Sequence, residues 1–258
     1  ENDPGNLSKP TAGRYVFAAS HTPDRTMTRL RRLAVRALPV GALILVACAS
    51  LRSPAAAQGA GWKSLFDGTS TAAWRGYKKQ EMPTGWAIVD GTLAKQKPVE
   101  DIMTREIFGD FEFEVEWKID KGGNGGIFYR ATEEYDRIYS SGTEYQLLDD
   151  ANAPDGRTRM TSAAAAYGLY PSPEGSLKPA GEWNTTRITI KKNHVEHWLN
   201  GTKVVEYELW SADWKAKVAA SKFAKYPNYG LATRGAIGFQ GDHNGALALR
   251  NIRIRPLD

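Results

Sequence analysis

The sequence has 258 residues, of which 34 are lysine or arginine and 29 are aspartate or glutamate, so its formal net charge is +5. Eight of the bases but only three of the acids lie in residues 1–59, which leaves 26 of each in residues 60–258. A neutral domain has no electrostatic reason to bind nucleic acid or an anionic membrane surface, and we expect neither as a partner.

Residues 27–59 have the pattern of an export signal. Met27 opens an arginine-rich stretch, an apolar run follows from Ala37 to Ala49, and Ala55-Ala56-Ala57 resembles a cleavage site. The run is shorter than the roughly 20 residues of a permanent membrane span. A buried core helix is the alternative. We interpret residues 1–26 as the product of a translation start placed too early, and expect residues 60–258 to be exported to the periplasm or cell surface.

Cys48 is the single cysteine, and it follows Leu45-Val46-Ala47 in a pattern similar to a bacterial lipobox. Lipidation would anchor the domain to a membrane through Cys48, whereas cleavage after Ala57 would remove this residue, and the sequence leaves both open. Residues 60–258 contain no cysteine, which excludes disulfides, thiolate catalysis and a thiolate metal site in this part of the chain.

The mature chain reads as strands. Apolar and charged residues alternate over residues 111–119, which predicts a strand with one buried and one solvated face. Asn200-Gly201 is the favoured pair for a type I′ hairpin turn between residues 194–199 and 203–208. Further strands are predicted over residues 86–94, 126–131, 143–148, 185–190, 236–240 and 246–254, with one short helix in 211–226. This pattern predicts a single all-β domain, a jelly-roll sandwich of two antiparallel sheets.

Several catalytic motifs are missing. The sequence has no His-x-x-x-His, no Gly-x-Ser-x-Gly and no phosphate-binding glycine loop. Only three histidines, His194, His197 and His243, follow residue 60, so we expect no His-rich metal centre. Jelly-roll glucanases carry a Glu-x-Asp-x-x-Glu strand, and residues 111–119 lack it; we therefore interpret the three glutamates there as a solvated strand face.

Residues 142–149 hold the best candidate for catalysis. In a strand, Glu144 and Gln146 share one face, while Tyr145 and Leu147 share the other. A carboxylate beside an amide can bond sugar hydroxyls or move a proton. Two exposed polar residues on an edge strand are the alternative.

Other candidates surround this pair in the sequence. Strand parity places Arg130 on the face of Phe128, with Asn124 at the start of the strand. Tyr167 and Trp183 lie in loop-rich segments, where an aromatic ring can stack on a sugar. The other polar candidates for substrate contact are Asn184, Gln240 and His243, the last of which follows Asp242 in a turn after a strand.

The order of these segments resembles the 3-keto-disaccharide hydrolase domain family, over nearly the whole mature chain from Trp62 to Ile254. The segments that carry the resemblance are Trp62 to Gly68, Trp86 to Leu93, Gly109 to Glu112, Gly126-Ile127-Phe128-Tyr129-Arg130, Glu144-Tyr145-Gln146-Leu147-Leu148-Asp149, Gly181-Glu182-Trp183-Asn184, His197 to Gly201, Gly235 to Gln240 and Arg250 to Ile254.

The resemblance implies a concanavalin A-like lectin or glucanase sandwich that acts on an oligosaccharide or glycoside oxidised at C3. It implies a pocket formed by Arg130, Glu144, Gln146, Trp183, Asn184 and Gln240. The family pattern has His-Pro-Asp after the Leu-Asp-Asp stretch, and Ala153-Pro154-Asp155 stands there in this chain.

A ketone at C3 acidifies the C2 proton, so a base can remove it and the C1 aglycone can leave by elimination. This route needs a base, which we assign to Glu144, and a donor for the enolate oxygen, which we assign to Arg130. Asp149 and His197 are the fallback bases. The route needs no cofactor and no pair of opposed carboxylates. The alternatives are a non-catalytic carbohydrate-binding module and an ordinary glycosidase, because fold alone does not decide between them.

Overall fold

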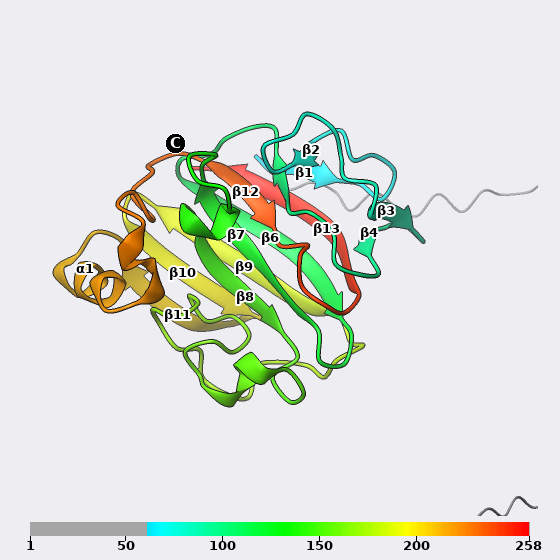
Figure 1. The fold of residues 1–258 in the computed structure, drawn as a ribbon. Helices are drawn as coiled ribbons and strands as arrows, with labels where there is room; N and C mark the ends of the chain where they lie inside the picture. Colours follow the sequence, from blue (N-terminus) through cyan, green and yellow to red (C-terminus); the bar gives the residue numbers. More distant parts are fainter. Residues whose placement is uncertain (1–60, 258) are drawn as a thin grey trace, which may run out of the picture. The chain divides into compact units, whose positions relative to one another are not determined.

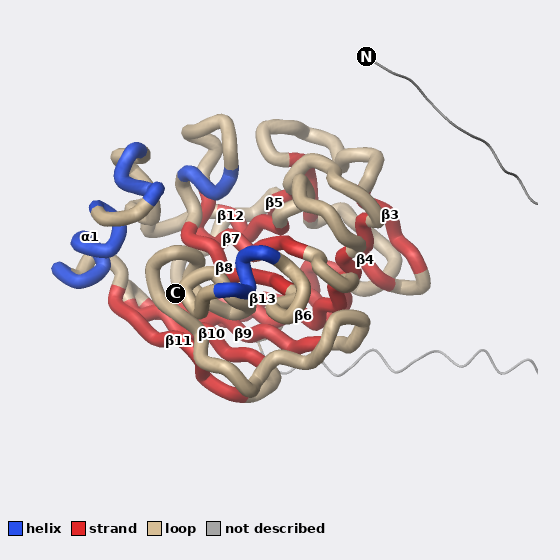
Figure 2. The backbone as a smooth tube through the Cα atoms, turned by 60° about the horizontal axis from the view of Figure 1, so that its bottom comes forward, coloured by secondary structure: helices blue, strands red, loops and turns tan. Residues whose placement is uncertain are grey.

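The computed structural model describes residues 61–257, which form two antiparallel sheets packed face to face (Figures 1 and 2). This architecture confirms the predicted all-β sandwich. The predicted export signal and the lipobox at Cys48 lie outside the described residues. No helix among the described residues is long and apolar enough to cross a lipid bilayer.

The larger sheet, sheet A, has eight strands in the order β11-β10-β9-β6-β13-β4-β3, with β1 also paired to β13. Its long central strands are β6 and β13, and β1 and β4 pair with different ends of β13. The bounds are β1 Lys63–Phe66, β3 Trp86–Val89, β4 Thr92–Lys95, β6 Phe111–Ile119, β9 Asn184–Lys191, β10 His194–Leu199, β11 Thr202–Glu208 and β13 Leu247–Pro256.

The smaller sheet, sheet B, has five strands in the order β2-β5-β12-β7-β8. Its bounds are β2 Trp74–Gly76, β5 Ile102–Thr104, β7 Asn124–Ala131, β8 Thr143–Leu148 and β12 Ala236–Phe239. The register between β12 and β7 shifts, since Ala236 pairs with Ala131 but Gly238 pairs with Phe128. Arg130 has a φ of 50° within this shift, so β7 contains a bulge next to its end.

The core lies between the sheets and follows the predicted alternation. Phe113, Val115 and Trp117 of β6 are fully or almost fully buried. They face apolar residues of sheet B such as Tyr145 and Phe239 in one continuous cluster. The glutamates that alternate with them on β6 lie on the outer face of sheet A, where Glu114 and Glu116 form ion pairs with Arg253 and Arg250 of β13. This confirms the interpretation of these glutamates as a solvated face.

Two local predictions can be compared with the structure. Asn200 and Gly201 have φ values of 50° and 85°, as the predicted hairpin turn between β10 and β11 requires. The helix predicted within 211–226 is shorter: α1 covers Ala212–Ala219, with Ser211 as its N-cap. The chain then starts a new 3₁₀ turn, η3 (Lys222–Lys225), because the Ser221 hydroxyl accepts a hydrogen bond from Phe223 N. Two further 3₁₀ turns are η1 (Ile138–Ser140) and η2 (Pro154–Arg157).

Candidate active site on the outer face of sheet B

The outer face of sheet B carries a group of polar side chains. Glu144 pairs with Phe128, and Gln146 pairs with Gly126, so all four positions lie on the face turned away from the core. Segment 164–167 continues the sheet beyond β8, because Ala164 N donates to Gln146 O and Tyr167 N donates to Glu144 O. This pairing covers the edge of β8 and brings Tyr167 beside Glu144.

Glu144 is held in a buried position. Only 5% of the residue is exposed, and a Cβ atom at Gly126 would overlap its carboxyl oxygen Oε1. The carboxyl group therefore lies over the neighbouring strand β7, where Gly126 leaves the space for it. Burial raises the pKa of Glu144 to about 8, and this rise is reinforced by nearby Asp101 and Asp155 and opposed by Lys222. A carboxyl group with a pKa close to neutral pH is suited to proton transfer.

A chain of amide contacts starts at Glu144. The oxygen end of the Gln146 amide lies 3.1 Å from Glu144 Oε1. The nitrogen end, Nε2, donates to Asn124 Oδ1 at 3.1 Å. With the amide turned over, Gln146 donates to Glu144 instead. Gln146 can therefore accept a hydrogen bond from a neutral Glu144 or donate one to an ionised Glu144.

The chain continues to Asp155, whose Oδ2 accepts from Asn124 Nδ2 at 3.2 Å and from the Tyr167 hydroxyl at 3.4 Å. Burial, followed by the charges of Asp155 and Glu144, raises the pKa of Tyr167 to about 12. The Tyr167 hydroxyl therefore keeps its proton at neutral pH and remains a hydrogen-bond donor. Above its ring, Lys222 Nζ lies 4.2 Å from the ring centroid.

Gln240 extends the polar face in the other direction. Its backbone N donates to Gly126 O, and its side chain lies on the outer face because Phe239 before it points into the core. Gln240 is 5% exposed, and its Oε1 has no hydrogen-bond partner. An unpaired buried acceptor is costly, so a ligand hydroxyl at this position would relieve that cost.

Three sequence candidates therefore come together with Glu144: Gln146, Tyr167 and Gln240. His243 lies at the rim, with a side chain that is 42% exposed and 3.3 Å from Asp242. The Asp101, Asp155 and Lys222 side chains, which act on Glu144, were not proposed from sequence as site residues. No sequence pattern indicated Lys222 as a site residue, because it lies in a lysine-rich segment far from β8 in the chain.

Arg130 does not join this group. Its guanidinium donates to Gly109 O (3.0 Å), Asp110 Oδ1 (3.0 Å) and Lys192 O (3.1 Å), which belong to segments flanking β6 and β9 of sheet A. The bulge at Arg130 breaks the parity on which its predicted position beside Phe128 depended. We therefore no longer assign Arg130 to an enolate oxygen.

The two fallback bases, His197 and Asp149, are held in structural hydrogen bonds. His197 lies fully buried between the sheets, where Nε2 is 3.0 Å from the Tyr129 hydroxyl and Nδ1 is 2.8 Å from Ala164 O. Burial lowers its pKa to about 4, so the ring is neutral. Asp149 Oδ2 accepts hydrogen bonds from Gly122 N and Asn152 Nδ2, both at 2.7 Å, and so stabilises two turns.

Trp183 and Asn184 lie away from Glu144. The Trp183 ring is covered on the outer side of sheet A by Arg250, whose Cζ is 4.0 Å from the ring centroid. Asn184 is buried, and its Oδ1 accepts from Lys178 N and Asn200 Nδ2. Both residues support the start of β9, and neither reaches the outer face of sheet B.

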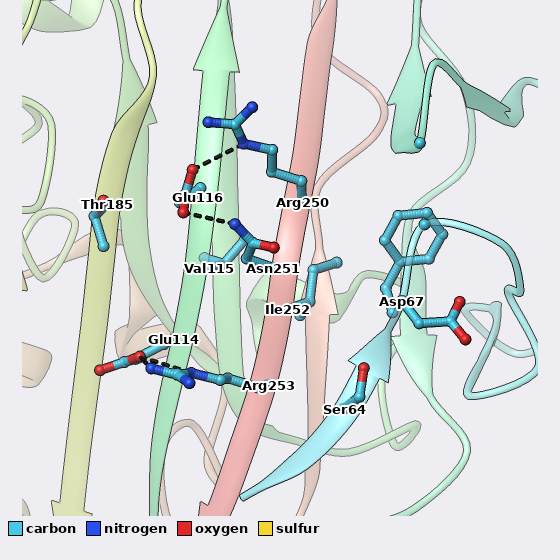
Figure 3. Close-up of a pocket in the computed structure, with 13 residues that line it drawn as sticks. Ser64, Asp67, Glu114, Val115, Glu116, Thr185, Arg250, Asn251, Ile252 and Arg253 are labelled. Atoms are coloured by element: carbon cyan, nitrogen blue, oxygen red, sulfur yellow. Dashed lines mark hydrogen bonds and ion pairs between the residues drawn. The ribbon is translucent and has the colours of Figure 1, made fainter. Parts of the chain in front are cut away.

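The larger of two cavities described, about 480 Å³, also lies on sheet A (Figure 3). It opens where β1 meets β13. Its carboxylates already have partners, because Glu114 pairs with Arg253 while Glu116 pairs with Arg250 and Asn251. This arrangement stabilises the sheet and leaves both glutamates paired with arginine.

One cluster in the described part of the chain could hold a metal ion: His194, Glu196 and Glu206 on β10 and β11. Lys203 already bridges it, with Nζ 3.1 Å from Glu196 and 2.7 Å from Glu206. The cluster lies on sheet A, and we assign it no role in the candidate site.

Comparison with known proteins shows the family of this chain. The model of the 3-keto-alpha-glucoside-1,2-lyase-like domain matches residues 61–255. The chain belongs to this family. A 3-keto-disaccharide hydrolase from Bacteroides thetaiotaomicron is 37% identical over 241 residues, which cover 81% of this chain and 82% of that protein.

Two crystal structures of candidate glycosyl hydrolases from Parabacteroides distasonis share the fold of this family member. The first has a TM-score of 0.72 and 31% identity, covering 77% of this chain and 94% of that one. The second has a TM-score of 0.64 and 30% identity, covering 76% and 99%. Ala153, the position at which the sequence resemblance led us to expect a histidine, is 5% exposed and packs in an apolar cluster with Leu148 and Ala163.

Proposed function

We propose that this domain cleaves 3-keto-glycosides, with Glu144 as the residue that removes the C2 proton. One observation carries this proposal: the carboxyl group of Glu144 is buried over Gly126, and burial raises the pKa of this carboxyl group to about 8. A base with a pKa near the working pH combines a useful ionised fraction with high proton affinity. The family match and the relative named 3-keto-disaccharide hydrolase support the choice of a C3-oxidised sugar.

In the proposed reaction, ionised Glu144 takes the C2 proton, and the C–H electron pair forms the enolate between C2 and C3. The C3 carbonyl then reforms, a C1–C2 double bond forms, and the C1–O bond breaks with its electron pair on the leaving oxygen. For hydrolysis, water gives its hydroxyl to C1 and its proton to the leaving oxygen, while Glu144 returns its proton to C2. If the product leaves before water adds, the proton on Glu144 passes through solvent to the leaving oxygen.

The enolate oxygen needs a positive charge or a hydrogen-bond donor close to Glu144. Lys222 is the cation that lowers the pKa of Glu144, which indicates that its charge acts at this position. The Tyr167 hydroxyl stays protonated, and its proton can turn from the long 3.4 Å hydrogen bond with Asp155 Oδ2 to the substrate. We assign the enolate oxygen to Lys222 and Tyr167, and the sugar hydroxyls to Gln146 and Gln240.

A matched pair of substrates tests the function: a glycoside and its 3-keto derivative, with release of the aglycone as the readout. We expect release from the keto compound alone. Glu144→Gln should lower turnover by about 10²–10⁴, the usual contribution of general acid–base catalysis, while Glu112→Gln on sheet A should have no effect. Near-wild-type turnover in Glu144→Gln would reject the assignment. Binding of the sugar with no release by the wild-type protein would favour a carbohydrate-binding module.

We also propose that the domain is exported, and that the mature protein begins at Cys48 with a lipid anchor or near Gln58 without one. The support is the signal-like pattern of residues 27–59. Mass spectrometry of the N-terminal peptide from native protein separates the two starts. Recovery of residues 1–40 on the mature protein would contradict export by this signal.

A further inference from the structure

A second cavity lies next to the candidate site and has no role in the proton transfer described above. Its volume is about 420 Å³, within the range of roughly 300–1,000 Å³ that is usual for small-ligand sites. Four segments line it: the turn after β2, the segment before β5, the β7–β8 loop and the turn after β12. Its polar lining residues include Lys79, Asp101, Arg137 and Asp242.

Gln240 connects this cavity to Glu144. The pairing of β5 with β12 joins Ile102 to Phe239, and one step further it places Asp101 opposite Gln240. On the other side, Gln240 pairs with Gly126, over which the Glu144 carboxyl lies. Neighbouring strands are about 4.8 Å apart, so the cavity wall at Asp101 is about two strand spacings from the carboxyl of Glu144.

The lining suits a sugar. The Asp101 carboxylate is 7% exposed, and its Oδ1 accepts from Gly241 N at 2.8 Å. Arg137 Nη1 lies 3.6 Å from Asp242 Oδ2, so the lining offers a hydrogen-bond donor next to acceptors. Tyr77 uses its hydroxyl to donate to backbone carbonyls, and its ring, with Pro98 and Val99, supplies the apolar part of the lining. A pyranose has hydroxyls for the charged groups and C–H bonds for the ring.

We propose that this cavity binds the leaving sugar of a 3-keto-disaccharide, with Asp101 and Arg137 bonding its hydroxyls. This inference rests on the proposed function. The reacting ring must place C2 at Glu144, so the next sugar has to extend along the sheet, and Gln240 with its unpaired Oε1 lies between the two positions.

The test compares two 3-keto substrates that share the reacting sugar, one with a second sugar as leaving group and one with a methyl group. Asp101→Asn keeps the acceptor for Gly241 N. Because the Asp101 charge also raises the pKa of Glu144, the substitution changes the base equally for both substrates. The readout is therefore the ratio of the two kcat/KM values, disaccharide over methyl glycoside, which should fall about ten- to a hundredfold, the cost of losing one hydrogen bond to a charged group. Arg137→Gln should act in the same direction. Asp67→Asn, the same change in the cavity on sheet A, is the control and should affect neither substrate.

Each outcome is decisive. An equal loss on both substrates would show that Asp101 serves the reacting ring or the fold, and would overturn the inference while the proposed function stands. Unchanged kinetics on both would also overturn it. Failure of the wild-type protein to cleave either keto substrate would overturn the proposed function and this inference with it.

Discussion

The carboxyl group of Glu144 fills the space that a side chain at Gly126 would occupy. The two residues lie on neighbouring strands of sheet B, and a Cβ atom built on Gly126 would overlap Glu144 Oε1. Glycine at this position therefore determines where the carboxyl group sits, and with it the burial that raises its pKa.

Gly126→Ala should therefore abolish most of the activity. The new methyl group would displace the carboxyl by about 1 Å, a shift that can cost on the order of 10²-fold in rate. Overpacking should also cost about 1–3 kcal/mol in the free energy of unfolding. Turnover of a 3-keto-glycoside and urea denaturation measure the two effects.

Gly125→Ala is the matched control. A Cβ atom there would meet Leu247 at 3.5 Å, an ordinary van der Waals contact on the core side of the same strand. Equal loss of turnover in both variants would mean that the strand, and not the Glu144 carboxyl, is sensitive to the substitution.

The pH dependence of kcat/KM should report the ionisation of Glu144. If ionised Glu144 is the base, kcat/KM should rise about tenfold per pH unit below the pKa and level off near pH 8. Lys222 lowers this pKa, so Lys222→Met should move the rising limb of the pH profile to higher pH and also reduce kcat. Lys225→Met, in the same 3₁₀ turn, is the control and should leave the limb in place. An unmoved limb in Lys222→Met would contradict the proposed position of this charge.

Glu144 should also make the fold less stable as pH rises. Its pKa is about 4.5 in the unfolded chain and about 8 in the folded protein, so the folded state binds the extra proton between these values. Stability is therefore lost through this window, with a slope of up to roughly 1.4 kcal/mol per pH unit.

Glu144→Gln removes this titration. Relative to the wild type, the variant should gain stability steadily from pH 5 to pH 8, because its neutral amide carries no cost of ionisation. Denaturant unfolding at several pH values measures the difference. A constant difference across the window would show that the Glu144 carboxyl has an ordinary pKa.

Sequence patterns predicted the parts of the fold that depend on neighbours in the chain. The alternation of β6 gave the buried positions of Phe113 and Trp117, and the parity of β8 placed Glu144 and Gln146 on one face. Such predictions succeed because side chains of a regular strand alternate strictly between its two faces.

The same parity failed at Arg130, because a bulge in β7 inserts a residue and turns the side chain toward sheet A. Lys222 and Asp101 could not be found in this way. Their approach to Glu144 depends on where η3 and the segment before β5 are placed by long-range packing, and no local pattern encodes that placement. The prediction that Trp183 contacts a sugar was wrong for a related reason. An aromatic residue outside a strand can cover either sheet, and here the Trp183 ring packs under Arg250 on sheet A.

Arg130 gives a prediction that separates structure from catalysis. It is buried, and its guanidinium ties β7 to Gly109, Asp110 and Lys192. Arg130→Met should lower the free energy of unfolding by roughly 3 kcal/mol, near the low end for breaking a buried ion pair. The cost should not be higher, because the Asp110 side chain is 22% exposed and can be rehydrated. Below its melting temperature, the variant should keep kcat within about twofold of the wild type, since general acid–base and charge effects on rate require a group at the reacting atoms. The control is Arg187→Met, which removes a surface arginine from the Trp198 ring on sheet A. It should lower the free energy of unfolding by at most about 1 kcal/mol.

The opposite result for Arg130→Met would be a hundredfold loss of kcat with unchanged stability. That result would assign Arg130 to the enolate oxygen after all and contradict its position in the structure.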